Sequence, residues 1–186
     1  MIRWITKHAA SLVVLATLLA VAGGYTAVAS PFGQGVFSAD VPFGAGTSMS
    51  IALAGTVNLM ATDQGGGIFS GSGAHTVTVT STDVVGYRLY LYAPTSTTLT
   101  NGSETIAASA NTNLGPLATD TWGYNTSGST TNFIGVTNRP VVLHDSVGPH
   151  KNGEATTVTY GIKVSATKGA GDYSGSIVYT AVGKSE

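Results

Sequence analysis

The stretch TVTYGIKVSATKGAGDYSGSIVYTAV, residues 157–182, decides the fold of this chain. In its first part, apolar residues occupy every second position from Val158 to Ala166, and mainly Thr, Lys and Ser stand between them. An apolar–polar alternation with a period of two turns one face of an extended strand toward a core and the other toward solvent. We therefore predict a strand over this segment.

A turn and a second strand follow. The run Lys168-Gly-Ala-Gly-Asp172 is rich in turn-forming residues and is expected to reverse the chain. Beyond it, Ile177, Tyr179 and Ala181 form one face of a final strand. The other face of that strand is also fairly apolar, which favours a central place in a sheet over an edge.

The same period recurs upstream. Short alternating segments lie at residues 49–53, 76–80, 87–92, 122–124, 134–136 and 141–144. Val57 and Leu59 continue the face of the first segment, Asn101-Gly102 is a tight-turn signal, and residues 106–117 predict a long loop. No helical period longer than about two turns occurs after residue 30.

These patterns predict an all-β protein, an antiparallel β-sandwich of immunoglobulin-like or jelly-roll-like type. A flattened barrel is the alternative. Two small domains, 48–92 and 120–182, are a less favoured division, because each would be marginal by itself without disulfides. We expect residues 1–29 to be a signal peptide with its helix, residues 30–46 an extended arm, and residues 47–186 one sandwich domain.

The first residues have the layout of a secretory signal peptide. Arg3 and Lys7 form a positive start, an apolar run follows, and Ala27-Val-Ala29 offers small residues for a signal peptidase. Cleavage after Ala29 and export are the favoured interpretation. If the leader is uncleaved, residues 9–28 are long enough to anchor the chain in a membrane.

Charge and cysteine content narrow the class of protein. Only 9% of residues are charged and there is no cysteine, so an exported domain would depend on its core alone. Without the two leader cations, six Lys and Arg stand against nine Asp and Glu. This acidic balance, with no basic patch, argues against a nucleic-acid partner. No cysteine can carry a lipid, and we expect no C-terminal anchor.

The final segment Val158–Ala181 resembles the last hairpin of many exported bacterial sandwich domains. Gly86–Leu91, Leu99–Ser103 and Asp120–Tyr124 resemble motifs of uncharacterised surface proteins of ultra-small candidate-phyla bacteria such as Saccharibacteria. The chain is also distantly similar to WxL-type wall-binding domains, although Trp122 is followed by Gly-Tyr. The resemblance implies a cell-surface location and a sandwich fold, and no catalytic residues.

One cluster is a candidate metal site. His144, Asp145 and His150 place two imidazoles and a carboxylate within seven residues. Their spacing matches no established site, and Gly148-Pro149 marks a turn, so a polar exposed loop is favoured. Loops that hold Asp63, Asp120 or Asp145 could supply oxygen ligands to calcium, but none has an Asp-x-Asp-x-Asp-Gly signature. We expect no metal and no cofactor.

One strand carries a candidate ligand face. Arg88, Tyr90 and Tyr92 share the side opposite the expected core. If this stripe is exposed, it is suited to binding a glycan or a protein partner. If a second sheet covers it, the stripe is part of the core. Core is the favoured interpretation, because exposed aromatic clusters are uncommon.

The sequence gives no signature of an enzyme. No Gly-x-Ser-x-Gly elbow occurs, and the acidic residues are scattered singly in turns, where capping is their ordinary role. We predict a non-enzymatic, exported component of a bacterial cell envelope, structural or adhesive, whose arm 30–46 adds a strand to neighbouring copies. The alternative is a soluble extracellular module that binds a glycan or wall polymer.

Overall fold

β-strands are the regular elements of the computed structural model, which describes residues 48–184. Within these residues no helix is long and apolar enough to cross a membrane. The predictions for the signal peptide and for the arm 30–46 fall on residues outside this range.

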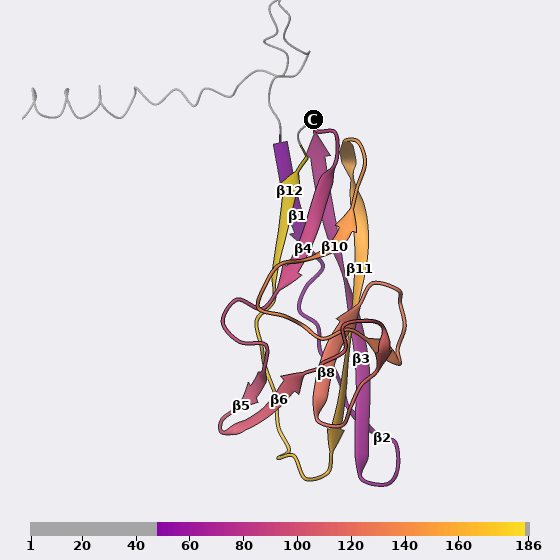
Figure 1. Cartoon of the computed structure of the whole chain (residues 1–186), viewed down its shortest axis with the longest axis vertical. Coiled ribbons are helices and arrows are strands. Elements are labelled where there is room, and N and C mark those ends of the chain that lie inside the picture. Colours follow the sequence, from indigo (N-terminus) through magenta and orange to yellow (C-terminus); the bar gives the residue numbers. More distant parts are fainter. Residues whose placement is uncertain (1–47, 185–186) are drawn as a thin grey trace, which may run out of the picture. The chain divides into compact units, whose positions relative to one another are not determined.

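Twelve strands occur between residues 48 and 184 (Figure 1). In chain order they are β1 (Ser48–Leu53), β2 (Thr62–Asp63), β3 (Ile68–Thr82), β4 (Tyr87–Tyr92), β5 (Leu99–Asn101), β6 (Glu104–Ala108), β7 (Gly115–Pro116), β8 (Thr121–Asn125), β9 (Asn132–Phe133), β10 (Val141–Asp145), β11 (His150–Ser165) and β12 (Val178–Gly183).

The strands form a long sheet, a short sheet and a two-stranded ribbon. The long sheet has the order β1-β3-β11-β8-β6-β5, with β2 also paired to β3; the short sheet is β10-β4-β12, and β7 pairs with β9. Every pairing is antiparallel except that of β6 with β8. The predicted all-β fold is confirmed. The predicted central place of the last strand is wrong, because β12 is an edge of the short sheet.

β3 and β11 extend through the whole described unit. They have 15 and 16 residues and pair from Glu154 to Ser165 without interruption (Figure 1). Different strands flank them along their length, which divides the unit into two ends. The two-sheet end comprises β1, β4, β10 and β12 with residues 76–82 and 150–158. The one-sheet end comprises β2, β5, β6 and β8 with residues 68–75 and 159–165.

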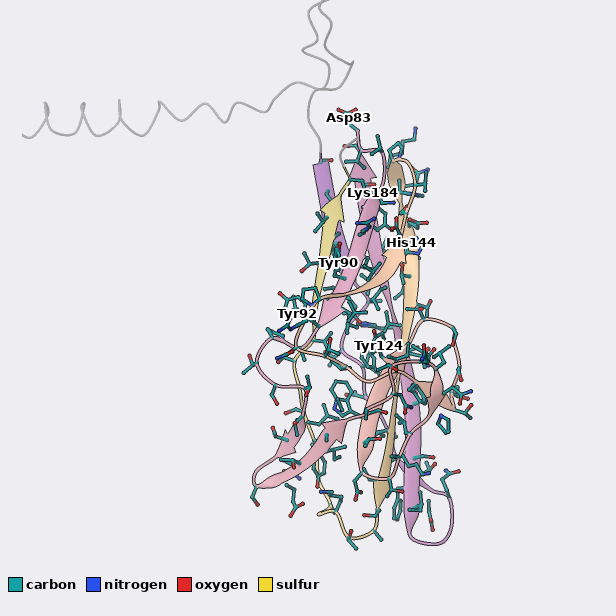
Figure 2. The ribbon with its side chains drawn as sticks, viewed as in Figure 1. Asp83, Tyr90, Tyr92, Tyr124, His144 and Lys184 are labelled. Carbon is teal, nitrogen blue, oxygen red and sulfur yellow. The ribbon has the colours of Figure 1, made fainter. Side chains whose placement is uncertain are left out.

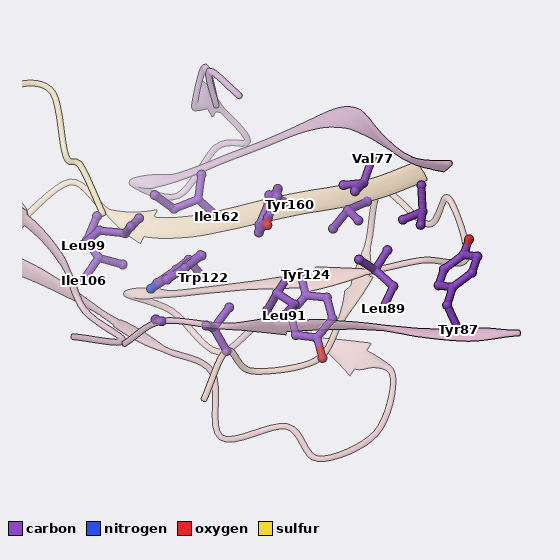
Figure 3. Packing of buried hydrophobic residues seen from close by; sticks show 14 residues of the cluster. Val77, Tyr87, Leu89, Leu91, Leu99, Ile106, Trp122, Tyr124, Tyr160 and Ile162 are labelled. Carbon is purple, nitrogen blue, oxygen red and sulfur yellow. The ribbon is translucent and has the colours of Figure 1, made fainter. Parts of the chain in front are cut away.

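At the two-sheet end, the short sheet covers the inner face of the long sheet. The side chains between them include Val77 and Val79 from β3, Leu89 and Leu91 from β4, and Val158 from β11, all with no exposed surface (Figure 3). This is the tightly packed part of the core.

At the one-sheet end, two pairs of glycines let other chain segments approach the long sheet. Gly123 and Gly161 are register partners, and a Cβ on Gly161 would run into the ring of Phe133, which covers this outer face. On the inner face, Cβ atoms on Gly71 and Gly73 would run into the backbone of residues 58–61. The glycines are needed for close approach rather than for a turn.

Several predicted boundaries are wrong at this end. Val57 and Leu59 do not extend the first strand; they cross the inner face of the long sheet as an irregular segment. The predicted loop 106–117 holds most of β6 and the short β7. Ile134 forms an isolated bridge with Tyr124 instead of starting a strand. The turn at Asn101-Gly102 is confirmed, with φ of 57° at Gly102.

Candidate functional site

The predicted ligand face lies on the outer side of the short sheet. Tyr90 and Tyr92 follow one another along β4, both half-buried and both outside the core cluster (Figure 2). The interpretation of this stripe as core is therefore wrong. In the register of the sheet, Val142 of β10 stands opposite Tyr90, and Val178 of β12 stands opposite Tyr92. The face is thus aromatic and aliphatic across all three strands.

A charged cluster closes one end of this face. The Arg88 guanidinium donates through Nε to Oδ2 of Asp145 at 2.9 Å, and Lys184 pairs with the other carboxylate oxygen. Lys184 also donates to the Ser146 carbonyl at 2.7 Å. The hydrogen bond from Lys184, followed by that from Arg88, lowers the pKa of Asp145. Asp145 is therefore an anion held between two cations.

The two candidate metal-binding histidines meet at a residue that the sequence analysis missed. His144 Nε2 lies 3.1 Å from one oxygen of Glu154, and His150 Nε2 lies 3.3 Å from the other. The Tyr87 hydroxyl donates to Glu154 at 2.7 Å, and Ser146 Oγ is 2.7 Å from His150 Nε2. The predicted partner Asp145 belongs to the cluster with Arg88 instead. Among residues 48–184, no group of three or more His, Asp or Glu side chains has an arrangement suited to a metal ion.

This cluster joins the two sheets through a stabilised carboxylate. Burial opposes ionisation of Glu154, but the nearby polar groups of Ser146, Tyr87 and His144 outweigh it and lower its pKa to about 2. Burial, and then the bond to Glu154, raises the pKa of Tyr87. His144 Nε2 is buried and near Glu154 without the alignment of a hydrogen bond. The position of Glu154 in the sequence, in the run Lys151-Asn-Gly-Glu154, gave no sign of this role.

A second polar chain crosses the boundary between the two ends. The His75 ring contacts the Gly55 carbonyl through Nδ1 at 3.3 Å and the Tyr179 hydroxyl through Nε2 at 2.6 Å. Tyr160 and Tyr179 share a hydroxyl contact of 2.6 Å. In a neutral ring whose Nδ1 carries the proton, Nδ1 donates to the carbonyl, so Tyr179 donates to Nε2 and Tyr160 donates to Tyr179. Burial raises the pKa of Tyr160, and that of Tyr179 to about 12.

The two other acidic residues considered for calcium accept hydrogen bonds from the protein itself. Asp63 accepts a hydrogen bond from the amide of Gly65 at 2.8 Å, in the turn before β3. Asp120, with φ of 63°, accepts from both the amide and the hydroxyl of Ser165. The carboxylate of Asp63 caps its turn, as the sequence pattern predicted, whereas that of Asp120 bonds to Ser165 of β11, 45 residues away in the sequence.

A groove lies on the inner face of the one-sheet end. Its volume is about 1220 Å³. Its floor is the inner face of β11 and β8, with Ile162, Val164 and Trp122. One wall is the irregular segment 53–61 and the other is the segment 166–177. No periodicity in the sequence could have predicted the groove, because the segments that border it have no regular structure.

Comparisons with known proteins give little beyond the fold. No protein-family model matches this chain, and no curated protein matches it. A solved structure titled "Chaperone-tip adhesin complex is vital for synergistic activation of CFA/I fimbriae biogenesis" is similar over 74% of this chain, at 15% identity and a TM-score of 0.49. The match spans 42% of that protein's length. Nothing about the partners or activity of this chain follows from it.

Proposed function

We propose that this protein is an exported, non-enzymatic component of a bacterial cell envelope, structural or adhesive, which assembles with neighbouring copies through strand addition by residues 30–46. One observation carries the proposal. In the described part of the chain, the short sheet covers one end of the long sheet, and irregular segments leave a groove of about 1220 Å³ at the other. A groove bordered by partly exposed apolar side chains can receive an interaction partner.

Two sheet edges support assembly by strand addition. β1 (SMSIAL) ends the long sheet, and β12 (VYTAVG) ends the short sheet. Neither strand contains a charged residue or a proline, the devices by which monomeric proteins protect exposed edges from pairing with another chain. The two edges lie on the same side of the sandwich, where β1 contacts β12. This side therefore offers backbone donors and acceptors to an added strand.

The chemistry of the polar clusters supports a non-enzymatic role. The Ser146–His150 contact is the nearest approach to a nucleophile and base, yet Ser146 is only 3% exposed. Glu154 meets the same nitrogen of His150 that faces Ser146, whereas an orienting carboxylate in a catalytic triad meets the opposite nitrogen. The cluster is suited to joining the sheets.

The test compares the exported chain with a variant lacking residues 30–46. Both proteins are recovered from cells, and their mass is measured by light scattering over a range of concentrations. We expect the complete chain to form oligomers that grow with concentration, and the shortened chain to stay monomeric. Monomers from both proteins would refute assembly through the arm.

A second candidate function is binding of a glycan or wall polymer, and the outward position of Tyr90 and Tyr92 favours it. Flat aromatic side chains on a rigid sheet present planar surfaces to sugar rings. The test is sedimentation with purified cell wall and binding to a glycan array. We expect the double variant Tyr90→Ala, Tyr92→Ala to lose binding. Loss without any change in oligomer size would separate this function from assembly.

A further inference from the structure

The groove of the one-sheet end has the size and chemistry of a receptor for a peptide segment. Its volume of about 1220 Å³ exceeds the roughly 300–1,000 Å³ typical of pockets for small ligands. Apolar residues dominate its surface, among them Leu59, Phe69, Ile162 and Val164. Leu59, Phe69 and Val164 are only partly buried, so an occupant would remove further apolar surface from water.

We propose that this groove binds residues 37–43 of a second copy of this chain in extended form, and so covers the apolar side chains that remain partly exposed at the one-sheet end. The proposal rests on the proposed function, since it assigns the place where the arm of a neighbour is held. A strand added along β1 or β12 is the competing location.

The sequence of the arm matches the groove. Phe37, Ala39, Val41 and Phe43 occupy alternate positions, so an extended chain presents them on one side. Ser38, Asp40 and Pro42 fall on the other side. One apolar face and one polar face are what a segment needs if it is to cover a hydrophobic sheet while its back faces solvent.

The reach of the chain limits what the arm of the same molecule can cover. Ser48 pairs with Thr82, and the part of the groove that β3 lines runs from His75 to Phe69, about 23 to 43 Å further along the strand at the usual strand rise. Phe43 precedes Ser48 by five residues and can extend at most about 18 Å from it. Val41 can extend at most about 25 Å. The arm of the same molecule therefore cannot bring Phe43 or Val41 to the far end of its own groove, beside Phe69.

Such a contact joins unlike surfaces. The arm precedes β1, whose Ser48 lies at the two-sheet end, whereas the groove lies at the one-sheet end. A contact between different surfaces of identical chains repeats from copy to copy and produces open filaments unless it closes into a ring. The inference therefore predicts linear polymers rather than two-fold dimers.

The absence of cysteine allows a direct test by disulfide cross-linking in the complete exported chain. One protein carries Val41→Cys in the arm, and a second carries Val164→Cys on the groove floor. The two are mixed and oxidised gently. Leu59→Cys on the groove wall is an alternative acceptor in case Val164→Cys impairs folding. Val147→Cys, in an exposed loop, is the matched control, and Val182→Cys reports on β12.

We expect mixed dimers at either groove position to form at least about tenfold faster than at Val147, because binding raises the local concentration of the thiols. Equal rates at the groove and at Val147 would overturn the proposal. Preferential cross-linking to Val182→Cys would also overturn it, and would leave assembly through the arm intact. A third protein carries both Val41→Cys and Val164→Cys. If cross-links form only within single chains of this protein, and none form between the two mixed proteins, the exchange between copies is refuted.

Discussion

The two-sheet end and the one-sheet end share the strands β3 and β11 but differ in how their inner face is covered. At the two-sheet end, Val77 and Val79 pack against Leu89 and Leu91, and none of the four has exposed surface. At the one-sheet end, the same strands carry Phe69 and Val164, which border a groove and are only partly buried.

The difference shows that alternation along a strand specifies which face is apolar, but not what will cover it. In β11, Val158 lies at the two-sheet end and Tyr160, Ile162 and Val164 lie at the one-sheet end, so the alternation continues past the boundary without marking it. The cover is supplied by β4, β10 and β12 at one end and by irregular segments at the other. One end is therefore fully packed, and the other retains partly exposed apolar side chains.

The largest expected effect is a contrast between two leucines. Leu89→Ala, in the fully packed core, should lower the free energy of unfolding by about 3–5 kcal/mol, because it leaves a cavity between the sheets. Leu59→Ala, on the groove wall, should cost about 1 kcal/mol or less, because the site already borders open space. Urea unfolding of the wild type and both variants measures this. Equal losses would show that the two ends are packed alike.

A smaller effect is expected where Phe133 covers the outer face of the one-sheet end. Gly161→Ala places a methyl group against the Phe133 ring and should cost about 1–3 kcal/mol through overpacking. Gly115→Ala is the matched control, since its added Cβ would meet neighbours only at ordinary contact distance.

Thermal unfolding compares these variants. Adding Phe133→Ala to Gly161→Ala should recover part of the clash energy in a double-mutant cycle. If the two substitutions are simply additive, the close approach of ring and backbone is not the reason for the glycine.

The next effect concerns the polar chain at the boundary of the two ends. Tyr179→Phe removes the hydroxyl that links His75 to Tyr160, and should cost about 1–2 kcal/mol because both partners lose a hydrogen bond in a partly buried site. Tyr173→Phe removes an exposed bond to the Gly169 carbonyl and should cost less. Urea unfolding of both variants decides the order, and the reverse order would contradict a linking role for the chain.

The smallest expected effect is a change in the slope of stability with pH. The pKa of Glu154 is about 2 in the fold against an ordinary value of 4.5, so its ionised form favours the folded state. Its contribution is complete above pH 4.5 and is lost as the pH falls toward 2. Glu154→Gln should flatten the decline of the unfolding midpoint over that range.

Glu104→Gln, on the exposed strand β6, controls for the same change in net charge. Midpoints of urea unfolding from pH 7 to pH 2 measure both variants. If Glu154→Gln follows the wild type at every pH, the cluster that joins the two sheets does not depend on an ionised Glu154.

The strands with strict apolar–polar alternation could be predicted from the sequence. A turn whose residues tolerate positive φ could be predicted as well. The segments Val158–Val164 and Tyr87–Leu91 gave the inner faces of β11 and β4, and Asn101-Gly102 gave the turn between β5 and β6. These features depend on local periodicity and on residues that tolerate positive φ. The prediction that Val57 and Leu59 extend the first strand was wrong. Gly71 and Gly73, which are distant in the sequence, leave the space in which this irregular segment runs.

The polar clusters could be predicted only in part. His144 and His150 are near in sequence, and the structure brings them together, but the group between them is Glu154, which shares β11 with His150 and lies in a different sheet from His144. Asp145, next to His144, belongs to the cluster of Arg88 and Lys184 instead. Adjacent residues of a strand point to opposite faces, so closeness in sequence does not place two side chains in one site.

The sequence by itself determined that residues 48–184 form an all-β unit and which residues of β4 and β11 face inward, because strand formation and facing depend on a period of two. Tertiary structure alone decided that Tyr90 and Tyr92 lie outside the core, that Glu154 joins the sheets, and that one end of the long sheet retains a groove. These outcomes depend on which distant segments meet, and the number of layers over a face is a property of the assembled sheets.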